Sequence, residues 1–478
     1  MKREEGINIM TFSSLTFLLL FFPIFLFGYW ILPLKYSNFW ILLCSLMFYY
    51  LGAHKQIIWL IIVILVSYFS ASIIRMVQKN IWKKIILSTT VICLVSILLY
   101  FKCMNLVNFY FCQWFGKEFA GNNEIILPIG ISFFIFQAIS YIVDIYRGGA
   151  DFIKNPIDMG VYIACFPQLI AGPIIRYKNI MNQINGKNRK KNWSVISEGI
   201  WKFCIGLVKK VLLANRLGSL ASLIIDSSYI SHYSVLYAWL GIVSYTLQIY
   251  YDFSGYTDMA IGIGKMMGFD YPENFNLPYA ATSIQDFWRR WHMTLTTWFK
   301  DYVYIPLGGN RCGFLKNIRN LFIVWLLTGL WHGGSWNFIL WGMGYFVLLI
   351  MEKVVKPSNY KGVLRSLYRI FSIIMVMLLW VMFRTKTLSN AFGFYQSLFG
   401  TYRNTMIDKA FLFQLKNYWL TISFGILFAL PCGHMIIDKI TSYKFGEGLS
   451  AFILLLLTGI SFVFILMGSY DPFLYFMF

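Results

Sequence analysis

The sequence is short of charge. Only 13% of its 478 residues are Asp, Glu, Lys or Arg and 58% are apolar, whereas about a quarter of an ordinary soluble domain is charged. Acidic residues are the scarcer kind, with 20 Asp and Glu against 41 Lys and Arg, which gives a formal net charge of +21. The basic residues stand in short stretches between apolar runs, as the positive-inside rule expects of a membrane protein. We therefore expect no nucleic-acid partner, although such a partner is the usual interpretation of a strongly basic soluble protein.

Paired cysteines and soluble linkers are also lacking. None of the eight cysteines belongs to a Cys-x-x-Cys pair and most lie in apolar runs, which favours buried apolar side chains over a metal or redox site. We predict one membrane-embedded domain over residues 1–478. It has a polar leader (1–11), a motif-rich catalytic core (252–350) and an aromatic C-terminal tail (469–478).

Apolar runs recur along almost the whole chain. Each must be helical or part of a closed barrel, because the bilayer core offers no water to unpaired backbone groups. We predict an all-α polytopic membrane protein with about 10–12 transmembrane helices, some of them re-entrant or broken. The predicted spans are 13–33, 37–51, 56–74, 85–101, 125–145, 196–214, 236–250, 370–384, 417–437 and 449–468.

Basic clusters predict the orientation of the spans in the cell membrane. Lys187, Arg189, Lys190 and Lys191 form the strongest cluster, so their loop should be cytoplasmic. Counting spans outward from it places both the N-terminus and the C-terminus outside.

Two apolar segments have polar, Gly-rich or Pro-rich middles and basic residues at both ends. They are residues 156–173 and residues 321–350, the second interrupted by Trp-His-Gly-Gly-Ser at 331–335. Flanks on the same side of the membrane indicate re-entrant or broken helices, which survive only where protein or a water-filled cavity covers them. The sequence therefore predicts a cavity beside His332.

His332 is the strongest catalytic candidate from the residues alone. Gly333 and Gly334 follow it and allow close approach of backbone or ligand. A neutral, desolvated imidazole could act as the general base of acyl transfer. The alternative is a packing histidine that is hydrogen-bonded across helices, and the residues leave both interpretations open.

The second candidate is His292, which follows a basic and aromatic stretch. Trp288, Arg289, Arg290 and Trp291 could form a surface for an anionic ligand such as a phosphate-bearing cofactor. An interfacial aromatic belt with basic anchors is the alternative.

Two carboxylates, Asp252 and Asp258, stand at the end of the predicted span 236–250. They could be catalytic acids or metal ligands, although no histidine or third acid lies at metal-ligand spacing from them. We expect them to be structural and hydrogen-bonded to nearby arginines.

An ordered set of motifs follows these carboxylates. It comprises Asp-Phe-Ser-Gly-Tyr-Thr-Asp from 252, Asn-Phe-Asn-Leu-Pro-Tyr from 274, Phe-Trp-Arg-Arg-Trp-His from 287, Tyr-Ile-Pro-Leu-Gly-Gly-Asn-Arg from 304 and Gly-Leu-Trp-His-Gly-Gly-Ser-Trp-Asn-Phe from 329. The set resembles the membrane-bound O-acyltransferase family, in its bacterial alginate O-acetyltransferase-like branch. That branch is related to proteins of peptidoglycan O-acetylation and teichoic acid D-alanylation.

The resemblance implies a membrane O-acyltransferase with a central tunnel and with His332 and His292 as its catalytic residues. It implies acetyl-CoA, or another cytoplasmic acyl thioester, as donor substrate and no bound cofactor. It also implies a cell-surface or exported polysaccharide as the final acceptor and an extracytoplasmic SGNH-type acetyltransferase as partner. The residues expected to line the donor site or tunnel are Trp288, Arg289, Arg290, Trp291, Trp331, Gly333 and Asn337.

The C-terminal tail resembles the endings of the same group. Tyr475 is the candidate acyl relay, because a phenol is a good leaving group with a pKa near 10. An aromatic anchor at the lipid interface is the alternative for the tail. For the whole chain the alternative is a transporter or flippase of an acyl carrier or lipid-linked sugar, since broken helices and a midplane cavity also suit transport.

Overall fold

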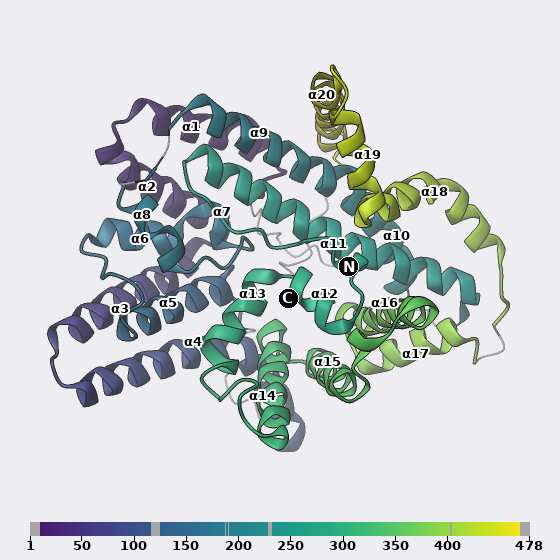
Figure 1. The fold of residues 1–478 in the computed structure, drawn as a ribbon, viewed down its shortest axis with the longest axis horizontal. Coiled ribbons are helices and arrows are strands. Elements are labelled where there is room, and N and C mark those ends of the chain that lie inside the picture. Colours follow the sequence, from purple (N-terminus) through teal and green to yellow (C-terminus); the bar gives the residue numbers. More distant parts are fainter. Residues whose placement is uncertain are drawn as a thin grey trace. The chain divides into compact units, whose positions relative to one another are not determined.

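The computed structural model describes residues 10–468 except 116–124, 187, 190, 228–231 and 402–403. The described residues form helices and no strands, which confirms the all-α architecture (Figure 1). By its internal contacts the chain divides into two compact units. One unit contains Met1–Phe203 and Tyr256–Glu273, and the other contains Cys204–Gly255 and Asn274–Phe478.

In the first unit α3 packs on α4 and α5, and α6 packs on α2. This unit includes α9 only as far as Phe203, and it also holds the last part of α11, from Tyr256 onward. Its elements are η1 (Phe17–Phe21), α1 (Phe22–Ile31), α2 (Leu34–Ala53), η2 (His54–Gln56), α3 (Ile57–Met76), α4 (Asn80–Phe115), α5 (Ile131–Tyr146), α6 (Pro156–Ala164), α7 (Phe166–Leu169), α8 (Tyr177–Ile184) and α9 (Trp193–Val208).

The predicted break in the segment 156–173 is present between α6 and α7. Cys165 separates the two helices with φ −56° and ψ 118°, and Pro167 begins the second helix. The backbone N–H of Phe166, freed by this break, donates to Ser45 Oγ of α2 at 3.1 Å. Irregular backbone is thus satisfied by a side chain of a neighbouring helix, as it must be away from water.

The second unit carries both candidate histidines. Its elements are η3 (Lys209–Ala214), α10 (Asn215–Ile225), the first part of α11 (Val235–Met266), η5 (Pro278–Ala280), α12 (Ile284–Arg290), α13 (Met293–Phe299), η6 (Lys300–Tyr304), α14 (Phe314–His332), α15 (Trp336–Val355), η7 (Pro357–Asn359), α16 (Gly362–Arg384), α17 (Leu388–Phe399), α18 (Lys409–Ala429), α19 (Pro431–Thr441) and α20 (Gly446–Leu466).

The segment 321–350 is also broken, as predicted, and forms a helical hairpin. The helices α14 and α15 lie side by side (Figure 1). A Cβ at Gly329 would lie 2.7 Å from the Phe338 carbonyl oxygen, and one at Gly342 would lie 2.5 Å from the Trp325 carbonyl oxygen. Glycine is therefore required at both positions for the two backbones to approach so closely.

One predicted span is bent. Residues 417–437 do not form a straight helix, because α18 and α19 meet at an angle of 80°. Leu430 at the junction is extended (φ −115°, ψ 161°) and Pro431 begins α19. Proline disfavours helical conformation in the residue before it and lacks an N–H donor, whereas the hydropathy of the run continues without a gap.

Within the described residues, five helical segments are long and apolar enough to cross a membrane, or six if the bent pair forms one span. The five are Leu34–Met76, Asn80–Phe115, Trp336–Val355, Gly362–Arg384 and Gly446–Leu466. The number of spans predicted from the sequence is larger. It also includes the shorter apolar helix α5 and the long, buried helix α11.

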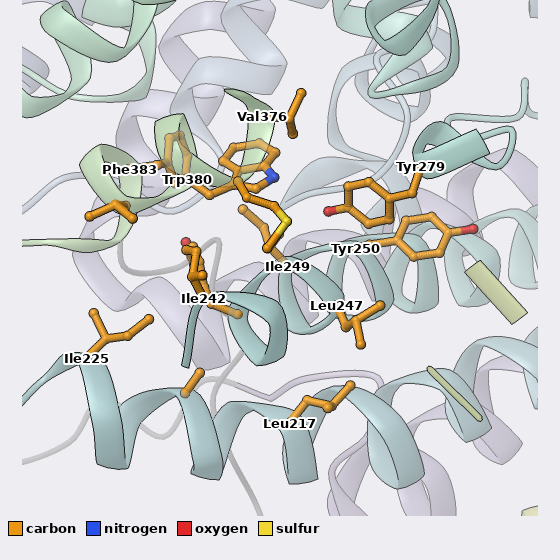
Figure 2. Packing of buried hydrophobic residues seen from close by; sticks show 14 of the residues in the cluster. Leu217, Ile225, Ile242, Leu247, Ile249, Tyr250, Tyr279, Val376, Trp380 and Phe383 are labelled. Atoms are coloured by element: carbon orange, nitrogen blue, oxygen red, sulfur yellow. The ribbon is translucent and has the colours of Figure 1, made fainter. Parts of the chain in front are cut away.

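The core of the second unit is rich in aromatic side chains, many of them from α11, α12, α15 and α16. Figure 2 shows Trp380 and Phe383 of α16 at one side of this core, and Tyr250 and Tyr279 close together at the other. The short helix α12 inserts Phe287 between these groups, at 6.2 Å from Tyr279 and 6.4 Å from Trp380. This packing fixes α12 and the turn that follows it.

Candidate active site

His332 is the last residue of α14 and is enclosed by aromatic rings. Its imidazole lies 4.7 Å from the Trp331 ring, 4.9 Å from Trp341 and 5.0 Å from Phe383, measured between ring centroids. The residue is only 6% exposed. The helix ends here because Gly333 is extended (φ 171°, ψ 156°), and a Cβ at Gly333 would lie 2.6 Å from the Phe338 ring.

Asn337 holds the aromatic surroundings of His332 together. It is buried on α15, and its Nδ2 donates to the Thr385 carbonyl oxygen at 2.7 Å and to Thr385 Oγ1 at 3.2 Å. Thr385 ends α16 two residues after Phe383, whose ring contacts His332. Asn337 was predicted to line the donor site or tunnel, and the contacts the structure gives it are to the end of α16.

His292 stands in the turn between α12 and α13 and is 1% exposed. Its backbone is left-handed (φ 42°, ψ 54°), which is unusual for a residue other than glycine. Its Nδ1 lies 3.0 Å from Asn274 Oδ1, and its ring packs edge-on against Phe253 of α11 at 4.8 Å. Burial lowers the pKa of the His292 imidazole well below the usual histidine value. The residue lies outside the candidate spans, and the lowered pKa favours its neutral form at physiological pH.

The structure brings the two histidines together around one indole. The Trp331 ring lies 6.1 Å from the His292 ring and 4.7 Å from the His332 ring. Two imidazoles predicted from separate motifs therefore belong to one buried cluster.

A pocket of about 1030 Å³ opens in the same unit, among α12, α13, α14 and α15 and the start of α16. Six basic side chains line it, and they are Arg289, Arg290, Lys300, Lys353, Lys356 and Arg365. Both lining carboxylates are already engaged. Asp286 pairs with Arg290 Nε at 3.0 Å, and Glu352 accepts hydrogen bonds from the backbone N–H groups of Ile284 and Gln285. The pocket is therefore strongly electropositive.

An aromatic wall separates this pocket from His332. Trp288 and Trp325 line the pocket and pack on each other at 4.8 Å. Trp341 lies behind them, 5.9 Å from Trp288 and 4.9 Å from His332. Neither histidine lines the pocket, so the cavity described here lies one aromatic layer away from His332 and not directly beside it.

The predicted donor-site residues divide between pocket and core. Trp288, Arg289 and Arg290 line the pocket. Trp291 packs instead in the core, 5.5 Å from Phe287 and 5.0 Å from Trp380. Tyr475 lies outside the residues that the structure describes.

The carboxylates Asp252 and Asp258 have lysine partners. Asp252 Oδ1 lies 2.5 Å from Lys210 Nζ within the second unit, and Asp258 Oδ1 lies 3.1 Å from Lys202 Nζ within the first. The sequence suggested arginines as partners, whereas these ion pairs are made by lysines of α9 and η3. The structural role remains the simplest interpretation.

Sequence reasoning missed two supporting residues. Asn274 orients His292, and Glu352 binds the N-terminus of α12 while accepting from the Tyr368 hydroxyl at 3.0 Å. Both are polar residues that are almost fully buried. Their partners lie far away in the sequence, so no local pattern indicates them.

Comparison with known proteins identifies the family to which the chain belongs. The model of the membrane-bound O-acyltransferase family matches residues 153–395. A protein named probable alginate O-acetylase AlgI, from Azotobacter vinelandii, is 38% identical over 433 residues, which cover 87% of this chain and 84% of the relative. The chain belongs to the membrane-bound O-acyltransferase family.

Other members of the family are also similar. The peptidoglycan O-acetyltransferase of Helicobacter pylori is 36% identical and covers 82% of this chain and 80% of its own length. The teichoic acid D-alanyltransferase of Bacillus subtilis is 30% identical over 50% of this chain and 62% of the relative. The chain is thus a multi-pass membrane O-acyltransferase. Both histidines and every residue of the electropositive pocket lie in the matched region.

Proposed function

We propose that this chain moves an acetyl group from a cytoplasmic acetyl-CoA across the cell membrane for the O-acetylation of a surface or exported polysaccharide. The proposal rests on a continuous series of contacts. It leads from the electropositive pocket through Trp288 and Trp341 to His332. The relatives named for alginate and peptidoglycan support both the acetyl group and the polysaccharide acceptor.

The pocket suits the phosphate groups of coenzyme A. Six basic side chains line it, and its two carboxylates already have partners within the protein. Arginine forks and lysine ammonium groups bind phosphate oxygens through charge-assisted hydrogen bonds. The thioester end of the donor would then face the aromatic wall of Trp288 and Trp325.

The buried histidines suit the chemistry of the transfer. A neutral His292 can accept the proton of an attacking hydroxyl, because burial disfavours its charged form. The hydroxyl oxygen bonds to the acyl carbon, the carbon–sulfur bond breaks, and the departing thiolate takes up the proton. His332, for which the sequence predicts the same role of general base, lies beside Trp331 and Trp341 in the same reaction centre.

On the outer side of the membrane, we propose that the acetyl group is transferred through the C-terminal tail. We place both chain termini outside the cytoplasm. Tyr475 would accept the acetyl group as a phenolic ester and pass it to an extracytoplasmic SGNH-type acetyltransferase, which completes the transfer to the polysaccharide. The structure does not describe this tyrosine, so the relay rests on the sequence of the tail.

Transfer from labelled acetyl-CoA tests the function. The purified chain in lipid nanodiscs should release free coenzyme A and acquire label on its C-terminal peptide. His332→Ala and His292→Ala should each lower the rate by about 100- to 10,000-fold, and Tyr475→Phe should abolish labelling of the tail peptide. Wild-type rates in both histidine variants would overturn catalysis and favour a transporter, which needs no general base. Labelling that persists in the Tyr475 variant would overturn the relay alone.

A further inference from the structure

Asn274 makes four hydrogen bonds to the short segment that contains His292. Its backbone carbonyl oxygen accepts from the Met293 N–H at 2.9 Å. Its side-chain Oδ1 lies 3.0 Å from His292 Nδ1, 3.2 Å from the Thr294 backbone nitrogen and 2.9 Å from Thr294 Oγ1. Asn274 is 1% exposed, so water does not compete for these contacts.

The Thr294 backbone amide decides which way the Asn274 side chain points. A backbone N–H can only donate, so the Asn274 atom that faces it must be the carbonyl oxygen and not the amide nitrogen. The same oxygen faces His292 Nδ1. That oxygen can only accept, and therefore Nδ1 carries the hydrogen. In the neutral ring the remaining nitrogen, Nε2, then holds the lone pair.

The backbone of the segment also depends on Asn274. His292 adopts a left-handed conformation (φ 42°, ψ 54°) that side chains other than glycine rarely take. The two residues that follow, Met293 and Thr294, both donate their N–H groups to Asn274. The side chain and the backbone carbonyl of Asn274 therefore hold both the backbone conformation and the tautomer of His292.

We propose that Asn274 is a positioning residue for acyl transfer, because it holds His292 as the Nδ1–H tautomer and leaves Nε2 as the nitrogen that accepts the proton. This inference rests on the proposed function of His292 as a base. Burial of the imidazole supports it, since the neutral ring is the form that has one donor and one acceptor nitrogen. The alternative is that Asn274 only stabilises the turn.

Nitrogen-15 spectroscopy tests the tautomer without any assay of activity. The full chain, labelled on its histidine nitrogens and reconstituted in lipid, is compared with the His292→Gln variant, and the difference spectrum isolates His292. We expect a protonated Nδ1 and an unprotonated Nε2 at neutral pH. A protonated Nε2 with a bare Nδ1 overturns the proposal, whether or not His292 proves to be the base.

Kinetics with acetyl-CoA separate positioning from stability. Asn274→Ala should lower kcat about 10- to 100-fold while the KM for the donor changes little. Asn274→Asp keeps the accepting oxygen and adds a negative charge beside the imidazole, which favours its protonated form. The acid limb of the pH–rate profile should therefore move to higher pH in this variant.

The surroundings of His292 allow a shift of the acid limb to be assigned to this imidazole. Its ring neighbours Phe253 of α11 and Trp331 of α14 do not titrate. Two charged residues lie close in sequence to this ring and its neighbours, and both are in ion pairs, Asp252 with Lys210 and Arg290 with Asp286. Asn276→Ala, at an exposed asparagine of the same segment, is the matched control and should keep the wild-type profile.

The outcomes distinguish the two proposals. If His292→Ala abolishes transfer but Asn274→Asp leaves the acid limb in place, the positioning role is overturned and the base remains. If His292→Ala retains the wild-type rate, the base is overturned, and the spectrum alone decides whether Asn274 sets the tautomer.

Discussion

His292 and His332 are linked through one side chain, because both imidazole rings pack against the Trp331 indole. Trp331 directly precedes His332 on α14, whereas His292 stands in the turn between α12 and α13. The indole therefore fixes the separation of two groups that come from different segments. A reaction that uses both imidazoles depends on this separation, since displacements of about 1 Å can cost about 100-fold in rate.

Trp331→Ala should therefore impair transfer more than substitution of an ordinary core residue does. We expect a rate loss of about 100-fold and a loss of about 3–5 kcal/mol in the free energy of unfolding, because a large buried side chain is removed. Trp331→Phe keeps a ring between the histidines and should recover most of the rate. Thermal unfolding and acetyl-CoA turnover are measured on both variants. Equal rates for the Ala and Phe variants would contradict the linking role.

Trp341 should limit the size of the acyl group. It is fully buried and lies between Trp288 of the pocket and His332. Trp341→Phe leaves a ring but opens space in the wall, so the ratio of butyryl to acetyl transfer should rise about tenfold. Trp336→Phe, at a half-exposed indole on the same helix, is the control and should leave the ratio unchanged. An unchanged ratio in the Trp341 variant would place the acyl route elsewhere.

The electropositive pocket should affect binding of the donor and not its chemistry. Arg289 lines the pocket and is exposed, so its contribution is screened by solvent. Arg289→Gln should raise the KM for acetyl-CoA about two- to fivefold with kcat unchanged. Lys316→Gln removes an exposed charge from α14 outside the pocket and serves as control. A fall in kcat at constant KM would contradict a donor-binding role for Arg289.

The buried ion pair of Lys210 and Asp252 should matter for stability. Both side chains are at most 5% exposed and their charged atoms are 2.5 Å apart. Lys210→Met leaves an uncompensated carboxylate and should cost about 3–5 kcal/mol, whereas adding Asp252→Asn should recover much of it. Lys265→Gln, which breaks the exposed pair with Glu198, should leave stability nearly unchanged. Thermal unfolding in detergent measures all three, and a double variant no more stable than Lys210→Met would contradict the pairing.

The sequence predicted those features that local patterns encode. Glycines around His332 predicted the broken helix, and a histidine within an apolar run predicted a buried imidazole. The bend at Pro431 was missed, although proline stands at the break, because the hydropathy of the run is continuous. Asn274 and Glu352 could not be predicted. Their partners lie 18 to 20 residues and 67 to 68 residues away in the chain, and the periodicity of one sequence does not report such contacts.

The neutral state of His292 predicts a dependence of stability on pH. Burial lowers the pKa of this imidazole in the folded chain below its unfolded value of about 6.5. The unfolded chain therefore binds a proton that the folded chain does not, and stability falls as the pH drops below about 6.5. The expected slope is about 1.4 kcal/mol per pH unit for this one group.

Thermal unfolding at pH 7.5 and pH 5 measures this contribution. His292→Gln should remove it, so the difference in Tm between wild type and variant should become smaller at the lower pH. His434→Gln changes an exposed histidine of α19 and should keep the wild-type slope. If His292→Gln unfolds with the same pH dependence as wild type, the pKa of the imidazole is the same in the folded and the unfolded chain, and burial does not lower it. That outcome would contradict the role of burial in keeping His292 neutral, and the transfer assay would then decide whether His292 is the base.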